Sequence, residues 1–126
     1  MTYGSEIVVN KTRARSSRLA ISIRQPYVEQ IFRGIKTDEY RSRPTNIRGR
    51  VYVYASLQPG QLKEFKRVDA EVGGLPTGVI VGSVEIAGCR YTARYQCYAY
   101  KLANPKRLTR PFRPTRRPQP MWFRPF

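Results

Sequence analysis

The segment RVYVYAS at residues 50–56 constrains the fold most, because its side chains alternate strictly. In an extended strand, its two valines and alanine face one way, and its two tyrosines and last serine face the other. Short segments rich in β-branched or aromatic residues, separated by Gly, Pro or Asn, predict further strands at 20–24, 35–41, 78–90 and 91–104. The chain is therefore expected to be mainly β.

Two amphipathic segments interrupt these strands. The first has Pro26 in its opening turn and Gly34 after its last turn, which are the usual signals for the start and end of a helix. The second carries apolar residues at roughly helical spacing over 60–74 and ends at two glycines. Few of the connections between successive strands contain a helix, so a mainly parallel sheet is not expected. We therefore predict an α+β, mainly β fold: a small mixed β-barrel of five to six strands with two or three short helices.

The two ends of the chain differ from its middle in composition. Residues 1–17 form a polar, basic arm in which only EIVV at 6–9 could be a strand. Residues 105–126 hold six prolines, seven arginines or lysines and no acid. Proline excludes a helix there, but a free tail would not carry the apolar cluster 121–123. We expect this segment to wrap the domain in extended form, with the cluster docked as an edge strand or plug.

Charge indicates the class of partner. The chain has 24 Lys and Arg against 8 Asp and Glu, a formal net charge of +16. Such an imbalance opposes compaction and points to a polyanion: RNA is the expected partner, with DNA as the alternative. No segment resembles a signal peptide or a membrane span, so a cytoplasmic monomer without a membrane partner is expected. The chain has no histidine, and Cys89 and Cys97 lack a metal-type spacing. No resident metal or cofactor is expected.

The stretch LAISIRQPYVEQIFRGIKTDEYRSRPTNIRGRVYVYAS resembles the N-terminal half of the ASCH domain, a PUA-like β-barrel. The resemblance rests on chained motifs, namely Arg24-Gln25-Pro26, then Gly34, Lys36-Thr37, Glu39 and Arg41, then Arg48-Gly49 and Ala55-Ser56. Glu85 matches a glutamate in a later strand of the family, and the likeness covers about 18–125. It implies an ASCH-like, PUA-like domain, which we place at 18–126 with the segment 105–126 included, and RNA binding as its activity.

The segment GIKTDEYRSRPTNIRG at 34–49 places two adjacent acids among four cations. A regular strand would put Lys36 and Glu39 on opposite faces, so they share a cleft only if the backbone bulges or turns. The family motif implies that they do. Glu39 paired with Arg41 or Arg24 would hold a guanidinium ready for a phosphate or a base edge. The alternative is a surface strand with ordinary ion pairs, each contributing about 0 to 1 kcal/mol.

These patterns predict a nucleic-acid-binding set with a cleft around Lys36, Glu39 and Arg41 and a basic surface for phosphates. Tyr52 and Tyr54 could stack on bases, which would contribute about 1 to 3 kcal/mol each to binding, or they could instead fill the core. The predicted set is Arg24, Lys36, Glu39, Arg41, Arg43, Arg48, Arg50, Tyr52, Tyr54, Arg113, Arg116 and Arg117.

Two other functions stay open. A hydrolase acting on RNA or on a modified nucleoside, as a ribonuclease or an amidohydrolase, would use Lys36, Glu39 and Glu85 as catalytic candidates. Only as a nuclease would it need Mg²⁺, held by Asp38 and the two glutamates. Distant ASCH members that hydrolyse modified cytidine use a Lys, a Thr and a Glu. Here Glu39 stands at the threonine's place, which argues against that chemistry. The other alternative is an accessory protein that coats nucleic acid without selectivity.

Overall fold

The structure is a computed structural model that describes residues 18–126. The predictions for the arm at 1–17, including its strand at 6–9, fall outside the described residues, and the domain boundary at 17/18 stays a prediction. In chain order the elements are β1 (Ala20–Arg24), α2 (Tyr27–Phe32), β2 (Asp38–Arg41), β3 (Gly49–Ser56), α3 (Leu62–Phe65), a 3-10 turn (Lys66–Val68), β4 (Val79–Thr92), β5 (Cys97–Phe112) and β6 (Trp122–Phe123).

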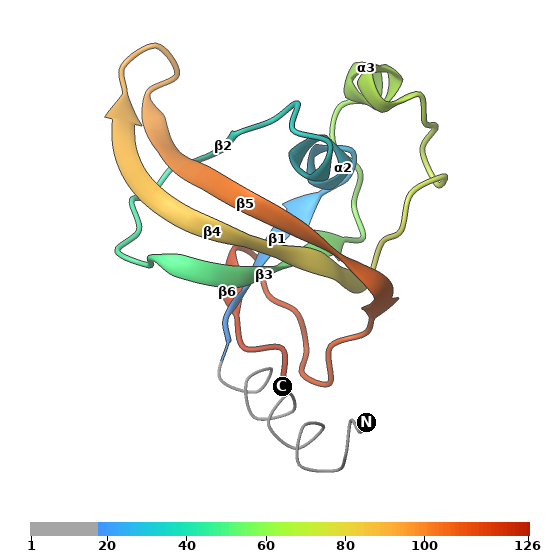
Figure 1. The fold of residues 1–126 in the computed structure, drawn as a ribbon. Coiled ribbons are helices and arrows are strands. Elements are labelled where there is room, and N and C mark those ends of the chain that lie inside the picture. The colour runs from blue at the N-terminus through green and yellow to red at the C-terminus, as the bar shows by residue number, and fades with distance from the viewer. Residues whose placement is uncertain (1–17) are drawn as a thin grey trace.

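The described strands form one mixed sheet in the order β2-β5-β4-β3-β1-β6. The pairing of β1 with β3 is parallel, and the other four pairings are antiparallel. The long β4–β5 hairpin arches across the molecule, with α2 and α3 above it and the C-terminal segment below it in the view of Figure 1. The sheet curls into a half-barrel. This confirms the predicted mainly β class with six strands and short helices.

Three predicted boundaries were wrong. The strand expected at 91–104 is split: its first two residues end β4, residues 93–96 form a turn, and β5 then runs on to Phe112. The helix expected over 60–74 is only one turn of α-helix and a 3-10 turn, because Asp69 adopts a left-handed φ of 52°. Strand β2 begins at Asp38 rather than Ile35, since the amides of Ile35 and Lys36 both donate to the Gln30 carbonyl.

Prolines in β5 lie where the ladder with β4 is irregular. Pairing shifts between Ser83 and Glu85, whose partners are Lys106 and Ala103, so Pro105 falls in the gap. Pro111 falls in a second gap, and the pairing of β5 with β2 spans only 98–101. Proline lacks an amide donor and is tolerated at such bulges and strand edges. The long strand therefore needs no hydrogen bond that proline cannot make.

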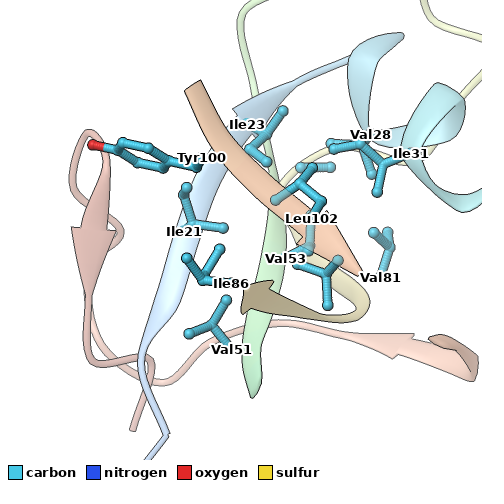
Figure 2. Packing of buried hydrophobic residues seen from close by; sticks show 12 residues of the cluster. Ile21, Ile23, Val28, Ile31, Val51, Val53, Val81, Ile86, Tyr100 and Leu102 are labelled. Carbon is cyan, nitrogen blue, oxygen red and sulfur yellow. The ribbon is translucent and has the colours of Figure 1, made fainter. Parts of the chain in front are cut away.

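The main hydrophobic core lies between the sheet and α2. Figure 2 shows side chains from β1, β3, β4 and β5 meeting Val28 and Ile31 of α2. On β3, Val51 and Val53 point into this core, as the alternation predicts. Tyr52 and Tyr54 face the other way, yet each is only 5% exposed. Both faces of β3 are therefore covered.

The cover on the tyrosine face of β3 is the C-terminal segment. Phe123 lies on the Tyr54 ring at a centroid distance of 5.4 Å, and Phe112 and Phe126 lie on Tyr52 at 5.8 and 6.4 Å. Strand β6 pairs antiparallel with β1 at the edge of the sheet. The structure thus places the apolar cluster as an edge strand, one of the two arrangements considered from the sequence.

Helix α2 is tied to β5 through Glu29, a buried carboxylate on the helix. Arg107 donates from both terminal nitrogens to its two oxygens at 2.9 and 3.2 Å, and Arg33 donates to it at 2.7 Å. Burial alone would raise the pKa of Glu29, but the hydrogen bonds and charges of these arginines lower it below the usual 4.5. Beside this contact, a Cβ at Gly82 would collide with Phe32 and with the backbone of β5. Glycine therefore lets α2 lie close to the sheet.

Candidate functional site

A cavity of about 590 Å³ opens between β1, β2 and the C-terminal segment. Its wall combines cations, a carboxylate, hydroxyls, two tyrosines and the apolar turn before β6. The lining residues are Ser22, Ile23, Arg24, Tyr27, Glu39, Arg41, Tyr54, Ser56, Leu57, Gln58, Pro118, Gln119, Pro120 and Met121.

Arg41 is held rigidly at this cavity by two acceptors. Its Nε donates to Glu39 Oε2 at 2.8 Å, and its Nη2 donates to the Ser22 carbonyl at 2.6 Å. Glu39 is 7% exposed, so the carboxylate holds the guanidinium from the protein side. A guanidinium carries five N–H donors. Within residues 18–126 these two acceptors engage two of them, so other donors of Arg41 are available to a ligand. The sequence-based pairing of Glu39 with Arg41 is present in the structure, whereas Arg24 takes another partner.

Lys36 reaches the same carboxylate because the chain turns before β2. Gly34 follows α2 at a φ of 79°, in the left-handed region that glycine adopts readily. The strand alternation then starts only at Asp38, so Lys36 is free to approach Glu39, and its Nζ lies 3.4 Å from Oε1. The turned backbone is therefore present and Lys36 contacts Glu39, but Glu39 and Arg41 line the larger cavity and Lys36 does not.

Arg24 and two tyrosines complete the polar and aromatic wall. Arg24 is exposed and donates to Gln58 Oε1 at 3.3 Å. Tyr54 lines the cavity although its ring is nearly covered, and burial raises the pKa of its phenol, against the opposing charge of Arg113. Tyr27 lines this cavity and also a second one. The site therefore offers one fixed and one adaptable guanidinium beside aromatic surface.

The second cavity has a volume of about 280 Å³ and shares Tyr27 with the first. Lys36 and Tyr40 line it, together with Glu64 and Arg67. The Lys36 ammonium lies 5.4 Å from the Tyr27 ring centroid and 5.2 Å from that of Tyr40. Lys36 therefore sits between two rings, whereas Arg41 serves the larger cavity.

Glu85 lies away from both cavities. It accepts hydrogen bonds from Arg50 at 3.1 Å and from Asn104 at 2.9 Å, and Arg50 also donates to Ser83 Oγ. The hydrogen bond from Asn104, followed by the contribution of Arg50, keeps the pKa of Glu85 below its usual value. The structure therefore does not bring the three catalytic candidates together: Glu85 and Arg50 form a cross-strand pair.

The remaining predicted residues lie on the surface or in the core. Arg43 and Arg48 are exposed in the loop between β2 and β3, and Arg48 donates to two carbonyls of that loop. Tyr52 is in the core, under the C-terminal segment. The three arginines of the C-terminal loop are exposed, namely Arg113, Arg116 and Arg117.

Within the described part of the chain, no three His, Cys, Asp or Glu side chains gather where they could hold a metal ion. Asp38 and Glu39 are neighbours on β2 and so face opposite ways, and Glu85 lies elsewhere. The carboxylates suggested for Mg²⁺ thus form no common site. Among residues 18–126, no helix has the length and apolar character needed to cross a membrane.

Most residues that line the larger cavity were not among the sequence-based candidates, and Ser22, Tyr27 and Gln119 are three of them. Ser22 donates through Oγ to the Gln119 carbonyl at 2.7 Å, which joins β1 to the C-terminal wall. Tyr27 directly follows the Arg-Gln-Pro motif, and this position could have identified it as a candidate site residue. Gln119 lies 97 positions from its partner, and no local pattern could have indicated this contact.

The family model of the ASCH domain matches residues 21–112 of the chain. A search of curated proteins found no match. The matched range runs from β1 to the end of β5, and residues 113–126, which supply one wall of the larger cavity, lie beyond it.

Proposed function

The chain belongs to the ASCH domain family, and we propose from its site that it is a nucleic-acid-binding module whose partner is RNA. ASCH domains have a PUA-like fold that is often linked to RNA binding. A net charge of +16 supports a polyanionic partner, because it favours long-range attraction to phosphates. The family supports the class of ligand, and the local geometry has to indicate where it binds.

The fixed guanidinium of Arg41 in the larger cavity is the observation that carries the proposal. Arginine can bind a phosphate or a base edge through two parallel hydrogen bonds, and Glu39 and Ser22 already orient this one. A volume of about 590 Å³ lies in the range of small-ligand sites, about 300 to 1,000 Å³. An unpaired nucleotide would place its phosphate or base edge on Arg41 and its ring against the aromatic and apolar wall.

A conservative substitution at Arg41 tests this site. Arg41→Lys keeps the charge but loses two-pronged binding, so affinity for a labelled single-stranded RNA should fall by about 5- to 100-fold, as for loss of a bidentate contact. Arg43→Lys is the matched control, because Arg43 is exposed in the adjacent loop outside the cavity. Fluorescence anisotropy measures both affinities, and thermal unfolding checks that the variants are folded.

A second cavity variant guards against structural damage at Arg41. Arg24→Ala removes an exposed cavity arginine that donates to Gln58, and it should also weaken RNA binding more than Arg43→Ala does. If the cavity and control variants lose RNA affinity equally, binding depends on overall charge and not on the cavity. Equal affinity for single-stranded and duplex RNA and DNA would favour the non-selective coating protein.

One observation favours a hydrolase as the second candidate function. Lys36 and Glu39 lie 3.4 Å apart beside the cavities, with side chains only 16% and 10% exposed. A lysine next to a carboxylate can move a proton. The same RNA should therefore be incubated with the protein, with and without Mg²⁺, and examined for cleavage. If the protein cleaves RNA, and Lys36→Met abolishes cleavage but not binding, the protein is a hydrolase and the proposal of a binding module is wrong.

A further inference from the structure

A row of three tyrosine rings and two cations leads from the larger cavity to the end of the β4–β5 hairpin. It begins at Tyr27, passes to Lys36 and continues to Tyr40 at the ring–cation distances given above. The Tyr40 and Tyr95 ring centroids are then 5.1 Å apart in an edge-to-face contact, and the Arg94 guanidinium lies 5.3 Å from the Tyr95 ring. We name these five residues the tyrosine row. Each step is a direct contact between neighbours.

The outer rings of this row are exposed. Tyr40 is 41% exposed and Tyr95 is 54% exposed. Tyr95 belongs to the turn at 93–96, which projects from the body of the molecule in Figure 1. Tyr40 lies on the face of β2 opposite Glu39, because side chains alternate along the strand. Neither of these two rings belongs to a hydrophobic core cluster, so burial in the core does not explain why they lie together.

The charge around the tyrosine row is positive. Lys36 and Arg94 belong to it, and the nearby acids are each engaged by an arginine. Arg90 contacts both oxygens of Asp38 at 3.3 and 3.4 Å, and Arg67 contacts Glu64 at 3.1 Å. The row therefore offers ring surface for stacking in a field that attracts anions. Exposed rings between cations are the combination by which proteins bind single strands.

We propose that the tyrosine row is a second binding surface, which holds unpaired RNA bases next to the nucleotide in the larger cavity. Bases stack on Tyr40 and Tyr95, and Lys36 and Arg94, which flank this pair of rings, contact the phosphates on either side. Tyr27 joins the two surfaces because it lines both cavities. This inference rests on the proposed function and adds to it that the ligand is single-stranded and longer than one nucleotide.

The test compares a short and a long ligand on matched variants. Tyr95→Ala should weaken a single-stranded RNA of about ten nucleotides by about 5- to 100-fold, the equivalent of one stacked base. Its affinity for a nucleoside monophosphate should stay unchanged, because the larger cavity is intact. Tyr95→Phe should restore the long ligand, since stacking needs the ring and not the hydroxyl. Tyr40→Ala should behave like Tyr95→Ala.

Tyr91→Ala is the matched control. Tyr91 is 58% exposed on the same hairpin, but its ring partner is Tyr98 and it lies outside the tyrosine row. It should bind both ligands like the wild type. An RNA duplex should bind Tyr95→Ala and the wild type equally, because paired bases cannot stack on the ring.

The outcomes separate the two proposals. If Arg41→Lys weakens both ligands while Tyr95→Ala weakens neither, the cavity function stands and the tyrosine row is wrong. If the wild type binds no RNA, both are wrong. Equal loss in Tyr91→Ala and Tyr95→Ala would show that any exposed ring suffices and would overturn the row. Tighter binding of single-stranded DNA, or displacement of RNA by polyglutamate at equal charge, would overturn RNA as its ligand.

Discussion

Replacing Phe123 by alanine measures how far the C-terminal segment stabilises the domain. Phe123 is 6% exposed and lies edge-to-face on Tyr54 at 5.4 Å. Truncating a buried phenylalanine costs about 3 to 5 kcal/mol, and a site next to an open cavity can collapse in part, so about 3 kcal/mol is expected. Unfolding entropy for a domain of this size is about 0.2 kcal/mol per kelvin. The melting temperature should therefore fall by about 10 to 15 °C.

Tyr91→Ala is the control that separates burial from ring contact. The Tyr91 ring also lies 5.4 Å from its partner in an edge-to-face pair, but its side chain is exposed. It should lose no more than about 1 kcal/mol. Urea titration followed by far-UV circular dichroism gives both free energies of unfolding, and the emission of Trp122, the one tryptophan of the chain, reports on β6. Equal stability of wild type and Phe123→Ala would refute the role given to this segment.

Three further predictions concern charge. RNA affinity should fall with salt at a slope of log K against log salt of about −2 or steeper, because each neutralised phosphate of a single strand contributes about −0.7; a flat response would contradict phosphate binding. Replacing Arg113, Arg116 and Arg117 together by alanine should weaken RNA binding in an anisotropy titration but leave the melting temperature nearly unchanged, because all three are exposed. The folded-state pKa of Glu29 is lowered, so its contribution to stability is present above the unfolded value of 4.5 and is lost as the pH falls through the folded-state value. Glu29→Gln should therefore be less stable at neutral pH and lose less stability on acidification, as urea titrations between pH 7 and 3 would show.

The sequence predicted well what depends on neighbouring residues. The alternation at 50–56 indicated β3 and its inward valines, and the Pro and Gly signals indicated α2. The pairing of Glu39 with Arg41 also followed from spacing, because alternate residues of a strand share a face. These features need no knowledge of the rest of the chain.

The errors have causes, one local and one distant in the chain, that a sequence pattern could not show. The turn at 93–96, ARYQ, has none of the Gly, Pro or Asn residues that usually mark a hairpin, and Gln96 itself takes a left-handed φ of 52°. Tyr52 and Tyr54 were candidates for stacking, but a strand pattern cannot tell what covers its second face. Phe112, Phe123 and Phe126 cover it, and they lie more than fifty positions further on. The exposed rings are those at the hairpin end.

The contribution of the C-terminal segment has a consequence for selectivity. Its residues 113–126 lie beyond the ASCH match at 21–112, yet Pro118 to Met121 form one wall of the larger cavity. Its attachment runs through the backbone: the Ser22 amide donates to the Met121 carbonyl at 2.7 Å, and Thr115 and Arg116 both donate to the Pro125 carbonyl. Arg41 and Glu39 lie within the matched range, so the proposed anion-binding part of the site belongs to the ASCH domain. Part of the wall against which a base would rest, Pro118 to Met121, is supplied outside it, so under the proposed function two chains that share Arg41 and Glu39 would select different bases if this segment differed.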